Sequence, residues 1–184
     1  KQDQYMAVFG GVTSLAFAKN GKVTVKPVRI KTKELKRLEE NILLFYTGIV
    51  RKSASILEEE DQKIRENYGP NIEALHNIKK IAFETKEAFE SGHLDRFGEL
   101  LNLHWQTKKK LSKKVSNVFL DECYETALKN GALGGKIMGA GGGGFFLFYH
   151  PGKDKSKLVR AMIKKGLQPM PFRFDHEGAR IIPN

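Results

Sequence analysis

Five of the six residues from Gly139 to Gly144 are glycine, and an apolar run, Phe145–Tyr149, follows directly. Glycine loses more conformational freedom on folding than any other residue, so a run this dense indicates a tight turn or a backbone that approaches a ligand closely. Successive N–H groups of such a loop can form a concave anion site. The segment predicts a phosphate-binding loop, made of Gly139, Ala140, Gly141, Gly142, Gly143 and Gly144. A glycine-rich turn that only leads into a buried strand is the alternative.

The surroundings of this loop exclude two common nucleotide-binding motifs. Its residues fit the spacing G-x-G-x-x-G, but that dinucleotide fingerprint follows a strand and opens a helix. Here a predicted helix ends near Asn130-Gly131, and a strand-like run follows the glycines. A Walker A loop needs Lys and then Ser or Thr after its last glycine, and Phe145 stands there instead.

The composition is that of a globular protein. Its 184 residues suffice for one ordinary domain, or for one domain and a fragment. The single cysteine, Cys123, excludes an intramolecular disulfide and a cysteine metal cluster. The five histidines form no H-E-x-x-H or similar pattern, so no metal ligands are predicted. No apolar run approaches about 18 residues and the first residues are not a signal peptide, so we expect a cytoplasmic protein without a membrane partner.

The formal net charge of +11 indicates an anionic partner. Basic proteins favour polyanions such as nucleic acid, anionic lipid or phosphorylated metabolites. The densest basic cluster is Lys108–Lys114, and no long basic tail is present. Charge alone does not separate RNA binding from the binding of a phosphorylated metabolite.

Turn signals and periodicity predict an α+β fold with an antiparallel sheet of about four strands and packed helices. Asn20-Gly21 is the strongest short signal for a hairpin turn. Predicted strands cover 13–18, 23–30, 42–47, 145–150, 172–174 and 179–182. Predicted helices cover 33–40, 55–68, 70–91, 94–111, 117–130 and 155–165.

The spacing of apolar residues predicts which side chains face the core. In the helix after Gly69-Pro70 these are Ile72, Leu75, Ile78, Ala82 and Phe89. In the later helices they are Leu94, Phe97, Leu101, Trp105, Leu111, Phe119, Cys123, Ala127, Leu158, Met162 and Ile163.

The ten residues Lys136–Phe145 resemble the third motif of the GHMP small-molecule kinases, which include galacto-, homoserine, mevalonate and phosphomevalonate kinases. Further segments resemble the branch that acts on D-glycero-D-manno-heptose 7-phosphate, with fucokinases as near neighbours. These segments are Lys1–Tyr5, Phe45–Gly48, His104–Lys109 and Ala132–Gly135. The resemblance extends over essentially the whole chain and implies a ferredoxin-like C-terminal kinase domain.

The departures from the family are as informative as the match. The family's second motif, a Pro/Gly/Ser-rich loop around the ATP phosphates, is absent, and so is the first domain that carries it together with the magnesium ligands. The resemblance implies that residues 1–31 are a trailing segment of that N-terminal domain, a β-hairpin, and that 32–184 are the C-terminal domain. A complete small protein with another role is the alternative.

The resemblance also assigns candidate site residues. It implies that Asp3 is the catalytic base that takes the proton of a sugar hydroxyl, whereas a frayed polar residue near a terminus is the alternative. Arg51 follows an apolar strand and can bind phosphate as a two-pronged donor, or form a solvated charge. Lys108 and Lys109 are candidates for the substrate phosphate, although one of them at most points into a site. Lys136 can neutralise a phosphate or pair with a surface acid.

Three further residues are assigned to packing rather than to the site. His104 and Trp105 are interpreted as packing residues, and Cys123 as a core residue.

The function that the resemblance implies is ATP-dependent phosphorylation of a sugar hydroxyl, namely the anomeric hydroxyl of a heptose 7-phosphate, with ATP and Mg²⁺ as cofactors. Another kinase of the family, such as a fucokinase, is one alternative. A non-catalytic module that binds RNA or another polyanion is the other. Aromatic residues interleaved with basic ones on an exposed sheet would favour RNA, whereas the contiguous aromatics of Phe145–Tyr149 are interpreted as buried. The isolated chain is expected to be inactive as a kinase, and its oligomeric state is left open.

Overall fold

The computed structural model describes residues 2–50, 58–59, 62 and 69–180. Its helices are α1 (Gln2–Phe9), α2 (Thr32–Asn41), α4 (Gly69–Ser91), α5 (Leu94–Leu111), α6 (Val118–Lys129) and α7 (Ser156–Lys164), with a short 3-10 helix, η1 (Lys113–Val115). Its strands are β1 (Thr13–Phe17), β2 (Val23–Pro27), β3 (Ile42–Tyr46), β4 (Gly134–Ile137), β5 (Phe145–Tyr149) and β6 (Gln168–Met170). The helix predicted over 55–68 falls mostly outside the described residues.

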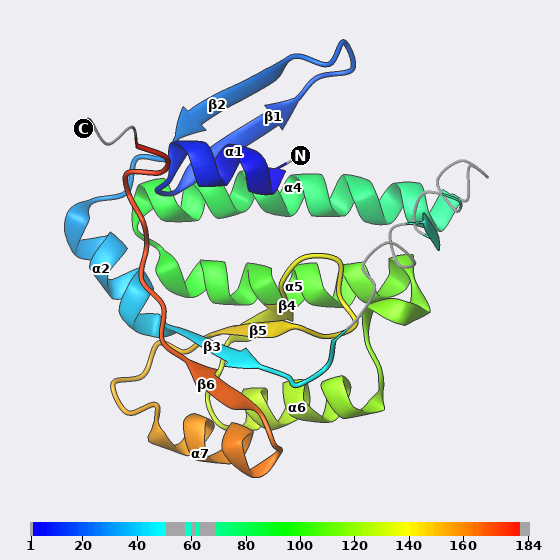
Figure 1. Ribbon diagram of the computed structural model, residues 1–184, viewed down its shortest axis with the longest axis vertical. Coiled ribbons are helices and arrows are strands. Elements are labelled where there is room, and N and C mark those ends of the chain that lie inside the picture. Colours follow the sequence, from blue (N-terminus) through cyan, green and yellow to red (C-terminus); the bar gives the residue numbers. More distant parts are fainter. Residues whose placement is uncertain (1, 51–57, 60–61, 63–68, 181–184) are drawn as a thin grey trace.

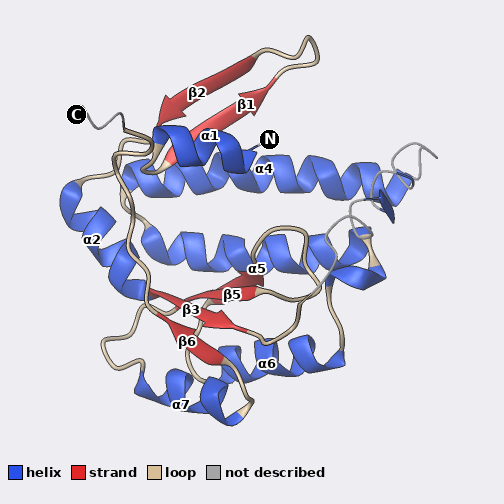
Figure 2. Cartoon of the chain, viewed as in Figure 1, coloured by secondary structure: helices blue, strands red, loops and turns tan. Residues whose placement is uncertain are grey.

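Strands β3 to β6 form one antiparallel sheet in the order β4-β5-β3-β6. The helices α4 to α6 connect β3 to β4, and α7 connects β5 to β6. The chain order is therefore the βαββαβ order of a ferredoxin-like domain. The helices α4 and α5 lie on one side of this sheet, and α6 and α7 on the other (Figures 1 and 2). This confirms the predicted α+β class and the four-stranded antiparallel sheet.

Two of the four strands in this sheet are not the ones that the sequence predicts. The first, β4, contains two glycines, and the sequence pattern predicts no strand there. Because these glycines have no side chain, α5 can lie directly on β4. A Cβ atom at Gly134 would lie 2.1 Å from the backbone oxygen of Gly98 in α5. The other unpredicted strand, β6, contains Pro169 and forms an edge of the sheet, where a residue without an N–H is tolerated.

The alternating side chains of the sheet separate two apolar cores. Phe146 and Phe148 of β5 pack with Phe45, Tyr124 and Leu158 in the larger one. The other core collects residues from α2, β3, α4, α5 and β5, namely Leu38, Ile42, Phe89, Leu94, Leu101 and Tyr149. The aromatic run of β5 is thus mostly buried as predicted, although its first residue, Phe145, is exposed. Cys123 is buried in the larger core, also as predicted.

The N-terminal hairpin forms as predicted. β1 pairs with β2 from Thr13 opposite Pro27 to Phe17 opposite Val23. The turn uses Gly21 in the left-handed region, with φ of +81°. Residues 2–9 before the hairpin form the helix α1, for which the sequence pattern predicts no element.

The C-terminal segment runs beside α2 to the start of the hairpin (Figure 1). The strand predicted over 172–174 is wrong, because the N–H of Phe174 donates to the Glu39 carboxylate at 2.8 Å and both phenylalanine rings of that stretch pack on the second core. Beyond it, the N–H of Gly11 donates to the Asp175 carbonyl at 2.5 Å. Of the strand predicted over 179–182, Ala179 and Arg180 are not in a strand, and the remainder lies outside the described residues.

The long helix α4 buries only part of the predicted face: Phe89 is buried as predicted, whereas Ile72 and Ile78 are half-buried. Leu75 and Ala82 are exposed. The buried residues are Asn71, Ala74, Ile81, Ala88 and Phe89. In α7, Ile163 is also exposed, while Leu158 and Met162 are buried as predicted. The small alanines of α4 bring it close to α5, and its other apolar residues remain available to line a cleft.

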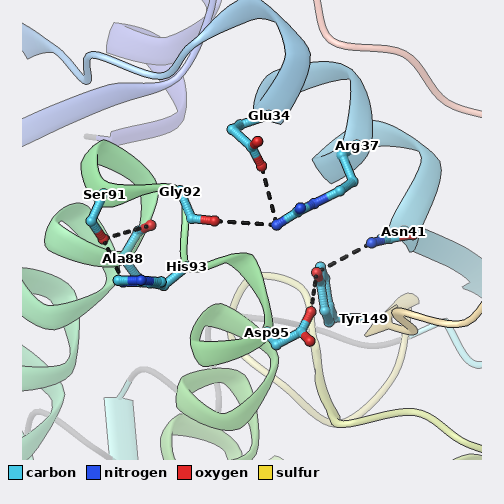
Figure 3. Close-up of polar contacts among 9 residues, drawn as sticks. All are labelled: Glu34, Arg37, Asn41, Ala88, Ser91, Gly92, His93, Asp95 and Tyr149. Atoms are coloured by element: carbon cyan, nitrogen blue, oxygen red, sulfur yellow. Dashed lines mark hydrogen bonds and ion pairs between the residues drawn. The ribbon is translucent and has the colours of Figure 1, made fainter.

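A polar cluster joins α2, the turn between α4 and α5, and β5 (Figure 3). The Tyr149 hydroxyl donates to Asp95 Oδ1 at 2.9 Å and accepts from Asn41 Nδ2 at 3.2 Å. Arg37 pairs with Glu34 at 3.1 Å and donates to the Gly92 carbonyl at 3.2 Å. Burial is the main reason that the pKa of Tyr149 rises to about 12. The hydroxyl therefore keeps its proton at neutral pH and remains a donor.

Tyr149→Phe is expected to lower the free energy of unfolding by about 1–3 kcal/mol, because it leaves the buried amide of Asn41 without its acceptor. Tyr46→Phe is the matched control, since the hydroxyl of Tyr46 makes no hydrogen bond in the part of the chain that the structure describes. It should change stability by less than about 0.5 kcal/mol. Urea unfolding of both variants measures the difference, and equal losses would contradict the role of this cluster.

Candidate functional site

The glycine loop connects β4 to β5 and is built almost wholly from left-handed backbone. Gly139, Gly141, Gly142, Gly143 and Gly144 all have positive φ, from +71° to +152°. Side chains other than glycine rarely adopt these angles, so the backbone itself requires the glycines. The run is therefore explained by conformation before any ligand is considered.

Two neighbouring segments hold the loop in place. The Gly142 N–H donates to the Val115 carbonyl at 2.6 Å, and the Gly144 N–H donates to the Ile49 carbonyl at 3.0 Å. The Gly144 carbonyl in turn accepts from both the backbone N–H and the hydroxyl of Thr47, at 2.8 and 2.9 Å. Segments that follow β3 and α5 thus fix the far end of the loop.

Other N–H groups of the loop remain for an outside acceptor. Gly139, Ala140 and Gly143 donate no hydrogen bond within the described part of the chain. Ala140 and Gly143 are nevertheless buried residues. Because backbone N–H groups inside proteins are almost always paired, these groups fit an acceptor such as water or a phosphate oxygen.

Two neighbouring lysines of α5 contact different parts of the molecule. Lys108 Nζ donates to the Gly139 carbonyl at 2.6 Å, so this lysine contacts the first residue of the loop. Lys109 points elsewhere: its Nζ lies 3.0 Å from Asp121 Oδ1 and 5.9 Å from the centroid of the Trp105 ring. The geometry brings Lys108 to the loop and gives Lys109 a partner on α6.

Lys136 and His104 lie near Lys108 on the α5 side of the sheet. The pKa of Lys136 is lowered to about 8, mainly by burial and secondly by the charge of Lys108. Burial, with the charges of Lys136 and Lys108, lowers the pKa of His104 to about 3. At neutral pH, Lys136 is therefore mostly cationic and the imidazole is neutral.

A cleft of about 350 Å³ opens beside these two residues, between the hairpin, α4 and α5. Its volume is within the range of small-molecule sites, about 300–1,000 Å³. Apolar side chains such as Ile78 and Phe97 form most of its walls, and Thr13 and Ser14 of β1 add hydroxyl groups. Lys136 and His104 belong to the same lining. Sequence reasoning placed His104 in the packing, and only its helical spacing of four from Lys108 could have linked it to the site.

Among the predicted site residues that the structure describes, Lys136 belongs to the lining of this cleft, whereas Asp3, Lys108, Lys109 and the glycine loop do not. Asp3 is exposed in the first turn of α1, a helix that packs on β1. An acidic residue there also interacts favourably with the positive end of the helix dipole. Arg51 lies outside the described residues. Among the residues that the structure describes, no group of three His, Cys, Asp or Glu side chains could hold a metal ion.

Within the described ranges no helix is both long and apolar enough to cross a membrane.

Comparison with known proteins adds a decisive observation. Residues 85–168 match the protein family described as GHMP kinases C terminal. This part of the chain is a GHMP kinase C-terminal domain. The matched range begins in α4 and contains His104, Lys108, Lys136 and the glycine loop.

Nearly the whole chain, and not only its GHMP domain, is similar to sugar kinases. The chain is 36% identical over 179 residues to the D-glycero-alpha-D-manno-heptose 7-phosphate kinase of Campylobacter jejuni. This match covers 97% of the chain and 52% of that enzyme. It is 31% identical over 163 residues to the L-fucokinase/L-fucose-1-P guanylyltransferase of Bacteroides fragilis, covering 86% of the chain and 17% of that protein.

A solved structure agrees with the GHMP fold. The crystal structure of a D-glycero-D-manno-heptose 1-phosphate kinase from Bacteroides thetaiotaomicron superposes with a TM-score of 0.69 at 29% identity. The superposition covers all of this chain and 49% of that one. The chain thus spans about half the length of the heptose kinases it matches.

Proposed function

We propose that this chain is the C-terminal half of an ATP-dependent sugar kinase, and that the reaction is phosphorylation of the anomeric hydroxyl of D-glycero-D-manno-heptose 7-phosphate. The observation that carries the proposal is the 36% identity to a heptose 7-phosphate kinase, which extends over 97% of the chain. The fucokinase relative at 31% identity supports the broader class of sugar kinases and keeps other sugars as the nearest alternatives.

The loop and its surroundings support a role with phosphate groups. In phosphoryl transfer the protein mainly positions the reactants and stabilises charge. The glycine loop offers unused N–H groups of Gly139, Ala140 and Gly143 to phosphate oxygens. Lys108 and Lys136 add positive charge beside that loop. The pairing of Lys109 with Asp121 favours a structural role for that lysine, and its contact with substrate stays a prediction, as does that of Arg51.

The proposal needs a second half for the remaining chemistry. Asp3 would act as the base toward the sugar hydroxyl, and residues 1–31 would belong to an N-terminal domain, with 32–184 as the C-terminal domain. Mg²⁺ would neutralise charge on the ATP phosphates. The family resemblance implies that the ligands of this ion belong to the other half.

The rival hypothesis of a basic RNA-binding module has less support. An RNA-binding sheet stacks bases on exposed aromatic side chains. In β5, Phe146, Phe148 and Tyr149 are fully buried, and only Phe145 is exposed.

A substrate panel tests the proposed function. The full-length protein that contains this chain is incubated with ATP, Mg²⁺ and each of several sugars and sugar phosphates, and ADP release is measured. We expect turnover of about 1–10³ s⁻¹ with the heptose 7-phosphate and none with residues 1–184 alone. ADP release by residues 1–184 alone at that rate would contradict the division into halves. RNA binding that weakens steeply with salt, without any sugar turnover, would favour the rival hypothesis.

A further inference from the structure

The cleft between the hairpin, α4 and α5 is apolar along its walls and positively charged where β4 enters it. Its titratable lining residues are Lys86, His104 and Lys136, and the described lining includes no Asp or Glu. Lys86 pairs with Glu90 on its own helix at 3.1 Å. The charge left facing the cleft is therefore that of Lys136, with Lys108 nearby.

Lys136 and His104 both lack the partners that buried polar groups normally have. Lys108 is the charged neighbour that acts on the pKa of Lys136, and it is a like charge. The Nδ1 atom of His104 is buried and has no hydrogen-bond partner in the part of the chain that the structure describes. Partial burial of a cation beside a like charge, and full burial of an unsatisfied ring nitrogen, both cost free energy. Groups kept at such a cost beside a cleft indicate a ligand-binding role.

The side chains that would meet this ligand come from three elements. Lys136 comes from β4, His104 comes from α5, and Thr13 and Ser14 come from β1. An ammonium group and a neutral imidazole with its proton on the other ring nitrogen, Nε2, can both donate to one anion. The Thr13 hydroxyl already donates to the Gly10 carbonyl at 3.0 Å, so it can only accept from a sugar hydroxyl, whereas the Ser14 hydroxyl can donate or accept.

We propose that this cleft binds the phosphate group that the sugar substrate already carries, with Lys136 and His104 as donors to its oxygens. The inference rests on the proposed function and names the part of the substrate that this domain recognises. A phosphate monoester fits better than a carboxylate, because its three terminal oxygens can accept from donors on separate elements.

The cleft adjoins the glycine loop through α5. Leu101, His104 and Lys108 follow one another at spacings of three and four, so they lie on one stripe of the helix. Leu101 and His104 line the cleft, and Lys108 contacts the loop. One helix face thus connects the two phosphate-binding regions, which suits an enzyme whose two substrates both carry phosphate.

Lys136→Met in the full-length protein tests the proposal. We expect KM for the heptose 7-phosphate to rise roughly 10- to 100-fold, as for the loss of one hydrogen bond to a charged group. KM for the same heptose without phosphate should change less than about threefold, since the lost partner is absent from that substrate. Lys129→Met removes an exposed lysine of α6, and it should leave both constants unchanged.

The nucleotide is the other source of phosphate, and the same kinetics separate the two. If KM for ATP rises in Lys136→Met while the preference for the phosphorylated heptose is kept, the phosphate in question belongs to the nucleotide and the proposal is overturned. If the wild-type protein phosphorylates no sugar at all, the proposed function fails. If it phosphorylates the heptose 7-phosphate but Lys136→Met keeps the wild-type KM ratio, only this inference fails.

Stability measurements keep a folding defect apart from a binding defect. Lys136→Met removes a partly buried cation that lies beside the like charge of Lys108, so its Tm at pH 7 should be equal to or higher than that of the wild type. His104→Gln keeps a donor near the position of Nε2, whereas His104→Phe removes it. We expect His104→Gln to retain most of the preference for the phosphorylated heptose and His104→Phe to lose it, and equal behaviour of the two variants would contradict a donor role.

The pH dependence supplies an independent readout. Lys136 is cationic below its pKa of about 8. The groups facing it are His104 and Lys108 from α5 and Lys86 from α4, and His104 is neutral above about pH 3. Affinity for the heptose 7-phosphate should therefore fall as the pH rises above about 8 in the wild type. The same profile in Lys136→Met would contradict the assignment to Lys136.

Discussion

Asp3→Asn is expected to lower kcat of the full-length protein by about 100-fold or more. KM for the heptose 7-phosphate should stay within about threefold of its wild-type value. Asparagine keeps the size and polarity of the side chain but cannot take a proton from the sugar hydroxyl. The proposed role of Asp3 thus affects the chemical step rather than the binding of substrate.

The position of Asp3 supplies the competing explanation and the control. As an acidic residue in the first turn of α1, it also stabilises that helix by about 0.3–1 kcal/mol through the helix dipole. A purely structural role would lower Tm slightly and leave kcat almost intact. Glu125→Gln, at an exposed position of α6, is the matched loss of one carboxylate. If kcat of Asp3→Asn falls less than about threefold, Asp3 is not the base or proton transfer does not limit the rate.

Gly141→Val is expected to reduce both stability and activity strongly. Gly141 has φ of +107°, and a Cβ atom there would lie 3.0 Å from the Cα, Cγ1 and carbonyl oxygen of Val115, a fully buried residue. The left-handed backbone costs a branched residue about 1–2 kcal/mol. The crowding against Val115 adds about 1–3 kcal/mol.

Gly166→Val separates these two contributions. Gly166 also has positive φ, +89°, but a Cβ atom there meets nothing within 4 Å. This variant should lose only the backbone part, about 1–2 kcal/mol, with full activity. Denaturant unfolding and kinetics on the full-length protein measure the comparison. If Gly141→Val folds normally and keeps more activity than Lys108→Ala, the loop is a structural turn and does not hold phosphate.

The regular parts of the fold could be predicted because local chemistry decides them. Asn20-Gly21 forms the hairpin turn that its sequence predicts. The apolar run at 42–47 becomes an interior strand because neighbouring strands cover both of its edges. The strand over 172–174 could not be excluded in the same way. Its alternation matches a strand, but Glu39, distant in the sequence, takes the N–H of Phe174.

The elements that were missed depend on tertiary contacts. β4 contains Gly134 and Gly135, residues that weaken a strand in isolation. These glycines are needed because α5 lies against β4, where any side chain at Gly134 would overlap the helix backbone. Similarly, the apolar spacing of α4 predicts a core face, but Ile78 and Ala82 line an open cleft. Periodicity alone does not separate a core from a cleft.

The candidate site was predictable only where its signal is local. The glycine loop is visible in the sequence because five positive φ angles need glycine at five positions. The three consecutive lysines of α5 are equivalent in the sequence, and only the structure sends Lys108 to the loop and Lys109 to Asp121. His104 was interpreted as a packing residue, since nothing local shows that its Nδ1 lacks a partner.

The identity of the reaction product tests the central claim most directly. The similar proteins are named for heptose 7-phosphate in one case and heptose 1-phosphate in another, so both sugars should be supplied to the full-length protein with ATP and Mg²⁺. Phosphorus NMR of the products then shows which hydroxyl is phosphorylated. We predict a 1,7-bisphosphate from the 7-phosphate, with the new phosphorus signal coupled to the anomeric proton. ATP consumption without a bisphosphate, or a bisphosphate from the 1-phosphate alone, would contradict the proposed reaction.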